Sequence, residues 1–241
     1  MKNKIVLLAL AAFAITSCRK EKENIIPGPT NGDVTVSVVY NVGGKQLLFD
    51  SIMYTNAAGN KFSVTKVHYY LSRFRFYSGG QVKYSSDTII YVDAQKNMQF
   101  GFTGLPASTY DSVSFHIGLD EAQNISNSLP ATIENVNMGW PDMMGGGYHF
   151  LKLEGHWEDT SGTLGYAMHI GNNGFMVRAG AKKSFTVTGG KTLNLKMNMD
   201  INEWFANPHT YNLATDGVYS MGNALLMKKL SENGGDVFTI E

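Results

Sequence analysis

Apolar and polar residues alternate along much of this chain. In one early segment the apolar positions are Val34, Val36, Val38 and Tyr40, the period of two expected of a strand with one buried face. Similar segments lie at residues 61–67, 69–77, 88–92, 112–117, 148–153, 164–170, 183–187 and 192–199. Turns rich in Gly, Asn and Ser separate them. This pattern predicts an all-β domain, an antiparallel sandwich or a barrel-like sheet.

The C-terminal part has a different pattern. Residues 223–230 are strong helix formers, and Asn233-Gly234-Gly235 is a good helical stop. We therefore expect a short C-terminal helix that closes the sandwich. Residues 236–241 can then supply a last edge strand.

The N-terminal residues have the composition of an export signal. Lys2 and Lys4 precede an apolar run at residues 5–15, which is too short to span a bilayer as a stable helix. Thr16-Ser17-Cys18 is similar to a bacterial lipobox, with cleavage before Cys18 and lipid on its sulfur; the alternative is an ordinary cleaved signal and a free thiol. We expect a signal peptide at 1–17, a lipidated, charged and turn-rich tether at 18–32, and a single domain at 33–241.

Composition narrows the possible functions. The 241 residues include 20 basic and 20 acidic side chains, so net charge favours neither nucleic acid nor an anionic membrane surface as a partner. Cys18 is the only cysteine, which excludes an intrachain disulfide and a Cys-based metal site. The expected location is the cell envelope, as an outer-membrane lipoprotein on the periplasmic or surface face.

Soft and borderline metal donors concentrate between residues 138 and 169. His149 begins one predicted strand and His169 ends the next, and the turn-rich residues 158–163 between them predict a hairpin. The open ends of the hairpin then bring the two imidazoles together, with His149 on the same face as Leu151. Imidazole and thioether groups suit copper, so His149 and His169 are the leading candidate ligands. The alternative is that both are hydrogen-bonded residues of a polar strand end.

The segment before His149 supplies further candidates. Met143, Met144 and Trp140 could supplement the two histidines, although methionines often fill cores and a Trp-Pro pair often packs a loop. Residues 145–147 are three glycines that do not open a helix, so they are not a phosphate cradle. Their expected role is to let the backbone turn sharply beside His149.

The other histidines are weaker candidates. His68 and His116 are expected on strand faces, and His209 lies in a loop where it could cap a helix or reach a metal. The chain has no Gly-x-Ser-x-Gly, no His-Glu-x-x-His and no cysteine nucleophile. We therefore do not expect an enzyme.

Several motifs follow one another along nearly the whole mature sequence. They are Lys66-Val-His-Tyr-Tyr-Leu-Ser72, Phe115-His-Ile-Gly-Leu-Asp120 with Asn124, Met138-Gly-Trp-Pro141, Gly147-Tyr-His-Phe-Leu-Lys-Leu-Glu-Gly155, His169-Ile-Gly171, Trp204-Phe205 and residues 233–238. In this order they resemble the MbnP-like proteins. That family comprises periplasmic or surface copper-binding proteins associated with methanobactin uptake, and many lipoproteins of Bacteroidetes type.

The resemblance implies an exported, β-rich protein that binds copper. In copper-binding members, histidines act with a tryptophan oxidised to kynurenine by a dihaem partner related to MauG, and a TonB-dependent transporter is a second implied partner. Trp140 is the corresponding tryptophan here. Many relatives carry Trp-x-Trp before Gly-Tyr, whereas this chain has Trp140-Pro141-Asp142 and an insertion-like segment at 143–146.

A second class of function needs no metal. The chain contains 12 Tyr and 13 Phe, and exposed aromatic side chains on the loops of a tethered sandwich could bind a glycan or a protein. The sequence leaves open both copper binding and this surface adhesion module.

Overall fold

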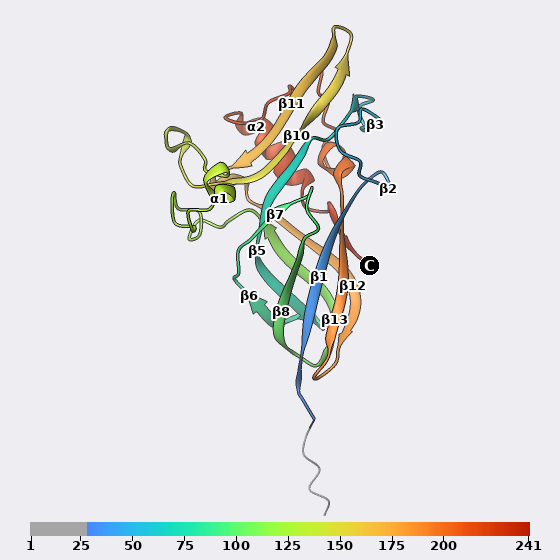
Figure 1. Cartoon of the computed structure of the whole chain (residues 1–241), viewed down its shortest axis with the longest axis vertical. Coiled ribbons are helices and arrows are strands. Elements are labelled where there is room, and N and C mark those ends of the chain that lie inside the picture. Colours follow the sequence, from blue (N-terminus) through green and yellow to red (C-terminus); the bar gives the residue numbers. More distant parts are fainter. Residues whose placement is uncertain (1–27) are drawn as a thin grey trace, which may run out of the picture.

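The protein is a mostly β molecule built from two sheets that face each other (Figure 1). Its structure, a computed structural model, describes residues 28–241. The expected signal peptide at 1–17, Cys18 and most of the expected tether lie outside the described residues. The β-rich class predicted from the alternation is confirmed.

The smaller sheet has the order β14-β13-β1-β2, with β8 also paired to β1. Its strands are β1 (Asn31–Val42), β2 (Lys45–Gln46), β8 (Gln99–Pro106), β13 (Thr192–Asp200) and β14 (Phe238–Ile240). The sheet is not wholly antiparallel, since β1 and β13 run parallel from the pair Asp33–Thr192 onward. The reason is that the turn at 188–191 carries the chain from the larger sheet to the smaller one and starts β13 where β1 also starts.

The larger sheet has the order β12-β9-β5-β10-β4-β3. β11 pairs with β10, and β6 and β7 pair with β5. Its strands are β3 (Tyr54–Thr55), β4 (Lys61–Phe62), β5 (Lys66–Ser78), β6 (Gln81–Ser86), β7 (Ile90–Asp93), β9 (Ser108–Ile117), β10 (His149–Asp159), β11 (Gly162–Gly171) and β12 (Val177–Val187). The β10–β11 hairpin extends beyond the two-sheet body in Figure 1.

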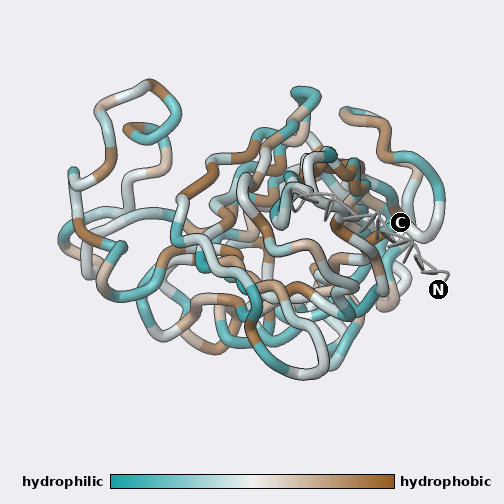
Figure 2. The backbone as a smooth tube through the Cα atoms, turned by 90° about the horizontal axis from the view of Figure 1, so that it is seen from below, coloured by the Kyte–Doolittle hydropathy of each residue, from teal (hydrophilic) through white to brown (hydrophobic). Residues whose placement is uncertain are grey.

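Aromatic side chains join the two sheets. Phe74 of β5 lies 4.7 Å from Phe102 of β8, and Phe115 of β9 lies 5.3 Å from Phe238 of β14, both measured between ring centroids. Such pairs stabilise a core beyond the area that they bury. Figure 2 shows hydrophobic and hydrophilic residues alternating along the backbone.

The helices are short. They are α1 (Ile133–Asn137), α2 (Ala224–Asn233) and the 3-10 turns η1 (Asp142–Met144), η2 (Asn173–Phe175) and η3 (Ile201–Phe205). The predicted C-terminal helix and edge strand are confirmed as α2 and β14, and the Asn223 side chain caps α2 by accepting from the backbone N–H of Leu225 and Leu226. Between residues 28 and 241, no helix has the length and apolar character needed to cross a membrane.

Candidate metal centre

The predicted hairpin forms and brings two histidines into contact. β10 and β11 pair from Asp159–Gly162 at the turn to His149–Gly171 at the open end. The rings of His149 and His169 meet there, with their centroids 5.0 Å apart and their planes nearly perpendicular at 85°. The two side chains therefore lie within reach of one bound ion.

A β-bulge decides which face His149 occupies. Leu151 pairs with Ile170 but His149 pairs with Gly171, so the register shifts between the two positions. An extra residue in one strand turns the following side chain to the other face. The expectation that His149 shares a face with Leu151 was therefore wrong: His149 lies with His169 and Lys152, on the face opposite the core.

His149 is buried and held by backbone. It is 5% exposed, and the Met138 carbonyl oxygen lies 3.1 Å from its Nδ1. A carbonyl only accepts, so Nδ1 carries the proton and Nε2 keeps its lone pair. Burial, with help from the nearby charge of Lys152, lowers the pKa of His149 to about 3. The imidazole is thus neutral at physiological pH, the form that binds metals.

His169 is oriented in the opposite sense by a carboxylate. Its Nε2 lies 3.0 Å from Glu154 Oε1, and Lys66 Nζ lies 2.8 Å from the other oxygen of that carboxylate. The hydrogen bond from His169, with that from Lys66, holds the pKa of Glu154 at about 2, so the ionised carboxylate accepts from His169 Nε2 and leaves Nδ1 outside that hydrogen bond. Ser220, from the segment before α2, fixes the backbone by accepting from His169 N–H and donating to His169 O, both at 2.7 Å.

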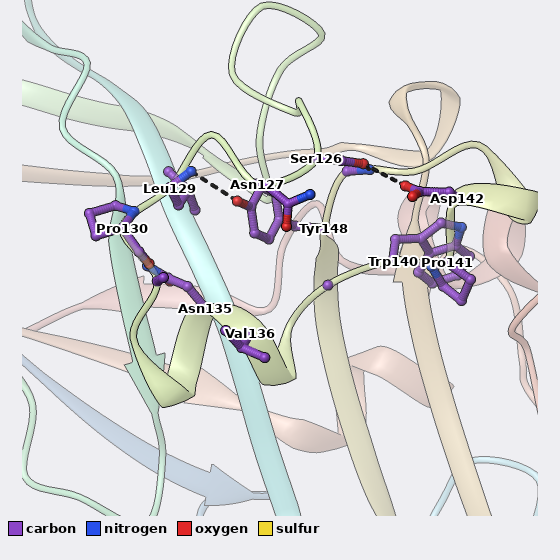
Figure 3. Close-up of a pocket in the computed structure, with 13 residues that line it drawn as sticks. Ser126, Asn127, Leu129, Pro130, Asn135, Val136, Trp140, Pro141, Asp142 and Tyr148 are labelled. Carbon is purple, nitrogen blue, oxygen red and sulfur yellow. Dashed lines mark hydrogen bonds between the residues drawn. The ribbon is translucent and has the colours of Figure 1, made fainter.

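Trp140 packs against the imidazole of His149. Its ring lies 4.7 Å from that of His149, between centroids, and its Nε1 donates to the Met144 carbonyl at 3.1 Å. Gly171 makes room for the indole, because a Cβ there would lie 2.3 Å from Trp140 Cε3. Trp140 also lines a pocket of about 350 Å³ with Asp142, Tyr148 and the loop around Ser126 (Figure 3).

Glycines bend the chain between Trp140 and His149 as expected. Residues 145–147 have φ angles of 110°, 68° and 83°, a region that favours glycine. At Gly147 a Cβ would also lie 2.3 Å from Asn124 Oδ1, which accepts the Tyr148 N–H at 2.8 Å. This turn lets Trp140 fold back onto the strand that follows it.

The two methionines differ in their surroundings. Met143 is 94% exposed, while the methyl group of Met144 lies beside Gly222 and its carbonyl serves Trp140. Among residues 28–241, no three His, Cys, Asp or Glu side chains are grouped as in a preformed metal site. The candidate centre consists of His149, His169 and Trp140.

His68, His116 and His209 lie outside the candidate centre. His68 faces Asp93 at 3.5 Å, and His209 pairs with Glu232 at the surface. His116 lies on β9 beside Arg178. The sequence reasoning missed two supporting residues, Glu154 and Ser220. Glu154 could have been recognised, because it lies two positions from Lys152 and therefore on the same face of the strand.

The family model of MbnP matches residues 31–223, which include the whole candidate centre. The chain belongs to the MbnP family. This is a family linked to copper and to methanobactin. MbnP from Methylosinus trichosporium has a similar solved structure, with a TM-score of 0.48 and 14% sequence identity over 75% of this chain and 80% of that one. No curated protein matches this MbnP-family chain.

Proposed function

We propose that this MbnP-family protein binds copper between His149 and His169. The observation that carries the proposal is the contact between the two imidazoles, whose ring centroids lie 5.0 Å apart and each of which has one nitrogen engaged, by Met138 O in His149 and by Glu154 in His169. Hydrogen bonds of this kind fix the tautomer and orientation of ligating histidines. His149 Nε2 and His169 Nδ1 are thus the two nitrogens available to the ion.

The donor chemistry fits copper. Two imidazole nitrogens suit Cu(I), and Lys152 places a positive charge near His149 that disfavours an ion of higher charge. Trp140 lies against His149, where its oxidised product would add a further donor. We assign that oxidation to a MauG-like dihaem partner, and the role of the protein to copper acquisition or handling rather than catalysis.

We further propose that Cys18 is lipidated and holds the protein at the outer membrane, where a TonB-dependent transporter is a possible partner. The support is the lipobox-like sequence before Cys18 and the apolar run at 5–15. Replacing Cys18 with Ser should release the protein from the membrane fraction. Retention of the variant there would argue against the lipid attachment.

Copper binding is tested by titrating Cu(I) against a competing chelator. Wild type should bind stoichiometrically, and His149→Ala and His169→Ala should each lose tight binding. His156→Ala is the matched control, because His156 lies on the same strand but is exposed. Intact mass of natively expressed protein then reports oxidation of Trp140.

Two outcomes would contradict the copper proposal. Equal binding by wild type and the two site variants would place the ion elsewhere. No binding by natively expressed wild-type protein would leave the metal-free adhesion module, for a glycan or a protein, as the function to test.

A further inference from the structure

A second polar concavity lies on strands β5, β9 and β12, outside the candidate copper centre. It has a volume of about 450 Å³, and its polar lining is Arg73, Arg75, Tyr77, Ser114, His116 and Arg178. Their neighbours Phe74, Phe115 and Val177 belong to the buried core. The concavity therefore occupies the outer face of the larger sheet, and none of its residues touches copper in the proposal above.

A bulge in β5 builds this face. Ser72 pairs with His116 and Arg75 with Ser114, so β5 has one more residue than β9 between the two pairs. That residue is Arg73, with φ at 55°, a conformation that non-glycine residues rarely adopt. The bulge keeps Ser72 and Arg75 on the outer face, whereas a regular strand would put them on opposite faces. Strained residues of this kind tend to occur at functional sites.

Positive charge exceeds negative charge in this concavity. Arg73 pairs with Asp87 at 2.8 Å and with Asp120, and Arg75 pairs with Asp87 at 3.0 Å. Within residues 28–241, Arg178 makes no ion pair or hydrogen bond through its side chain. Three guanidinium groups thus face two carboxylates, and the exposed Arg178 is the one available to a ligand.

Neutral hydrogen-bonding groups surround Arg178. His116 is its direct cross-strand partner, and His116 Nδ1 is shielded from solvent with no hydrogen-bond partner in the described part of the chain. The hydroxyls of Tyr77 and Ser114 lie 3.0 Å apart, so one donates to the other and one proton remains free to donate outward. Guanidinium and hydroxyl donors therefore converge from three strands, and the His116 ring lines the concavity beside them.

We propose that this concavity binds a tetrahedral oxyanion, a phosphate or sulfate group, with Arg178 as its principal donor and Arg75, His116 and the Tyr77–Ser114 hydroxyl pair around it. The planar fork of arginine matches two oxygens of such a group, and donors on separate strands reach the others. The surplus guanidinium repels cations, so this is not a second metal site. A volume of about 450 Å³ accommodates a small molecule that carries the anion.

The test is calorimetric titration of the full protein with inorganic phosphate and with sulfate, at constant ionic strength. Wild type should show saturable binding of at least one anion, and Arg178→Gln should weaken it about tenfold or more. Arg75→Gln should weaken it as well. Lys45→Gln is the matched control, since it removes the same charge from an exposed position on the other sheet. Circular dichroism verifies that each variant folds.

Two further probes identify the source of the phosphate. Phenyl phosphate represents a soluble monoester, and vesicles containing phosphatidic acid represent a lipid headgroup. Binding of either that requires Arg178 and is competed by inorganic phosphate supports the site, and the tighter probe names the source. The proposal is overturned if wild type shows no saturable anion binding, or if Arg178→Gln binds as tightly as wild type or no more weakly than the Lys45→Gln control.

Discussion

The packing of Trp140 against Gly171 makes a sharp prediction about the variant Gly171→Ala. The added Cβ would lie 2.3 Å from Trp140 Cε3 and 2.6 Å from two further indole carbons. Carbon atoms in contact are separated by about 3.5–4.0 Å, so the indole must retreat by roughly 1 Å or more. Trp140 is only 3% exposed and has little free space to enter. The substitution therefore acts through the position of the indole.

The energetic cost has two parts. Overpacking of a buried side chain costs about 1–3 kcal/mol. Movement of the ring also strains or breaks the 3.1 Å hydrogen bond from Trp140 Nε1 to Met144 O, which is worth about 1 kcal/mol. We expect the free energy of unfolding to fall by about 2–4 kcal/mol. Copper affinity should fall too, because the indole moves away from the His149 imidazole.

The assays are urea denaturation followed by far-ultraviolet circular dichroism, and Cu(I) competition with a chelator. Gly165→Ala is the matched control on the same strand, since its Cβ would meet nothing nearer than an oxygen at 3.9 Å. That control should stay within about 0.5 kcal/mol of wild type. If Gly171→Ala unfolds like Gly165→Ala and binds copper equally well, Trp140 is not packed as described and its part in the site is refuted.

Three other predictions concern the support of the two imidazoles. Glu154→Gln should weaken copper binding by about 10–100-fold, because outer-shell partners of ligating histidines have effects of this size; Glu158→Gln, on the same strand but exposed, should not change it. Ser220→Ala should lower the free energy of unfolding by about 1–3 kcal/mol, since it removes the Ser220 hydroxyl that binds the backbone N–H and C=O of His169. Urea denaturation measures this; an equal fall in stability for the exposed control Ser161→Ala would contradict the reasoning. The third concerns pH. The pKa of His149 is about 3 in the fold and 6.5 unperturbed, so between these values the unfolded chain binds more protons and stability falls as pH falls. From pH 6.5 to 5 this contributes a loss of about 2 kcal/mol, which denaturation at each pH should show in wild type but not in His149→Gln.

Local patterning predicts the strands that have one buried face. β1 alternates strictly between buried and partly exposed residues, and the sequence shows the same alternation. β8 escaped prediction because Gly101, Gly104 and Pro106 interrupt its pattern, and β6 because most of its residues are exposed. The parallel pairing of β1 with β13 depends on where a turn crosses between sheets, which alternation does not encode.

The candidate centre was predictable to the extent that it depends on the hairpin. A turn-rich segment between two strands suffices to bring His149 near His169. The bulge beside His149 leaves no signal in the alternation of apolar and polar residues. The face of the sheet that His149 occupies could therefore not be derived from the sequence. Ser220 comes from a segment 51 residues beyond His169, and only tertiary structure joins the two.

The two imidazoles are held by acceptors of different character, and this makes them unequal as ligands. His149 donates to a neutral carbonyl and has the positive charge of Lys152 nearby, so its hydrogen-bond partner adds less electron density to the ring than a carboxylate would. His169 donates to an ionised carboxylate, a partner that strengthens a ligating histidine as a metal donor. In the proposed site, Glu154 therefore strengthens the bond to His169, while burial keeps His149 unprotonated and available as pH falls. Lys66 shares the Glu154 carboxylate with His169. Removing Lys66 should therefore strengthen the effect of Glu154 on His169, whereas removing Glu154 should abolish it.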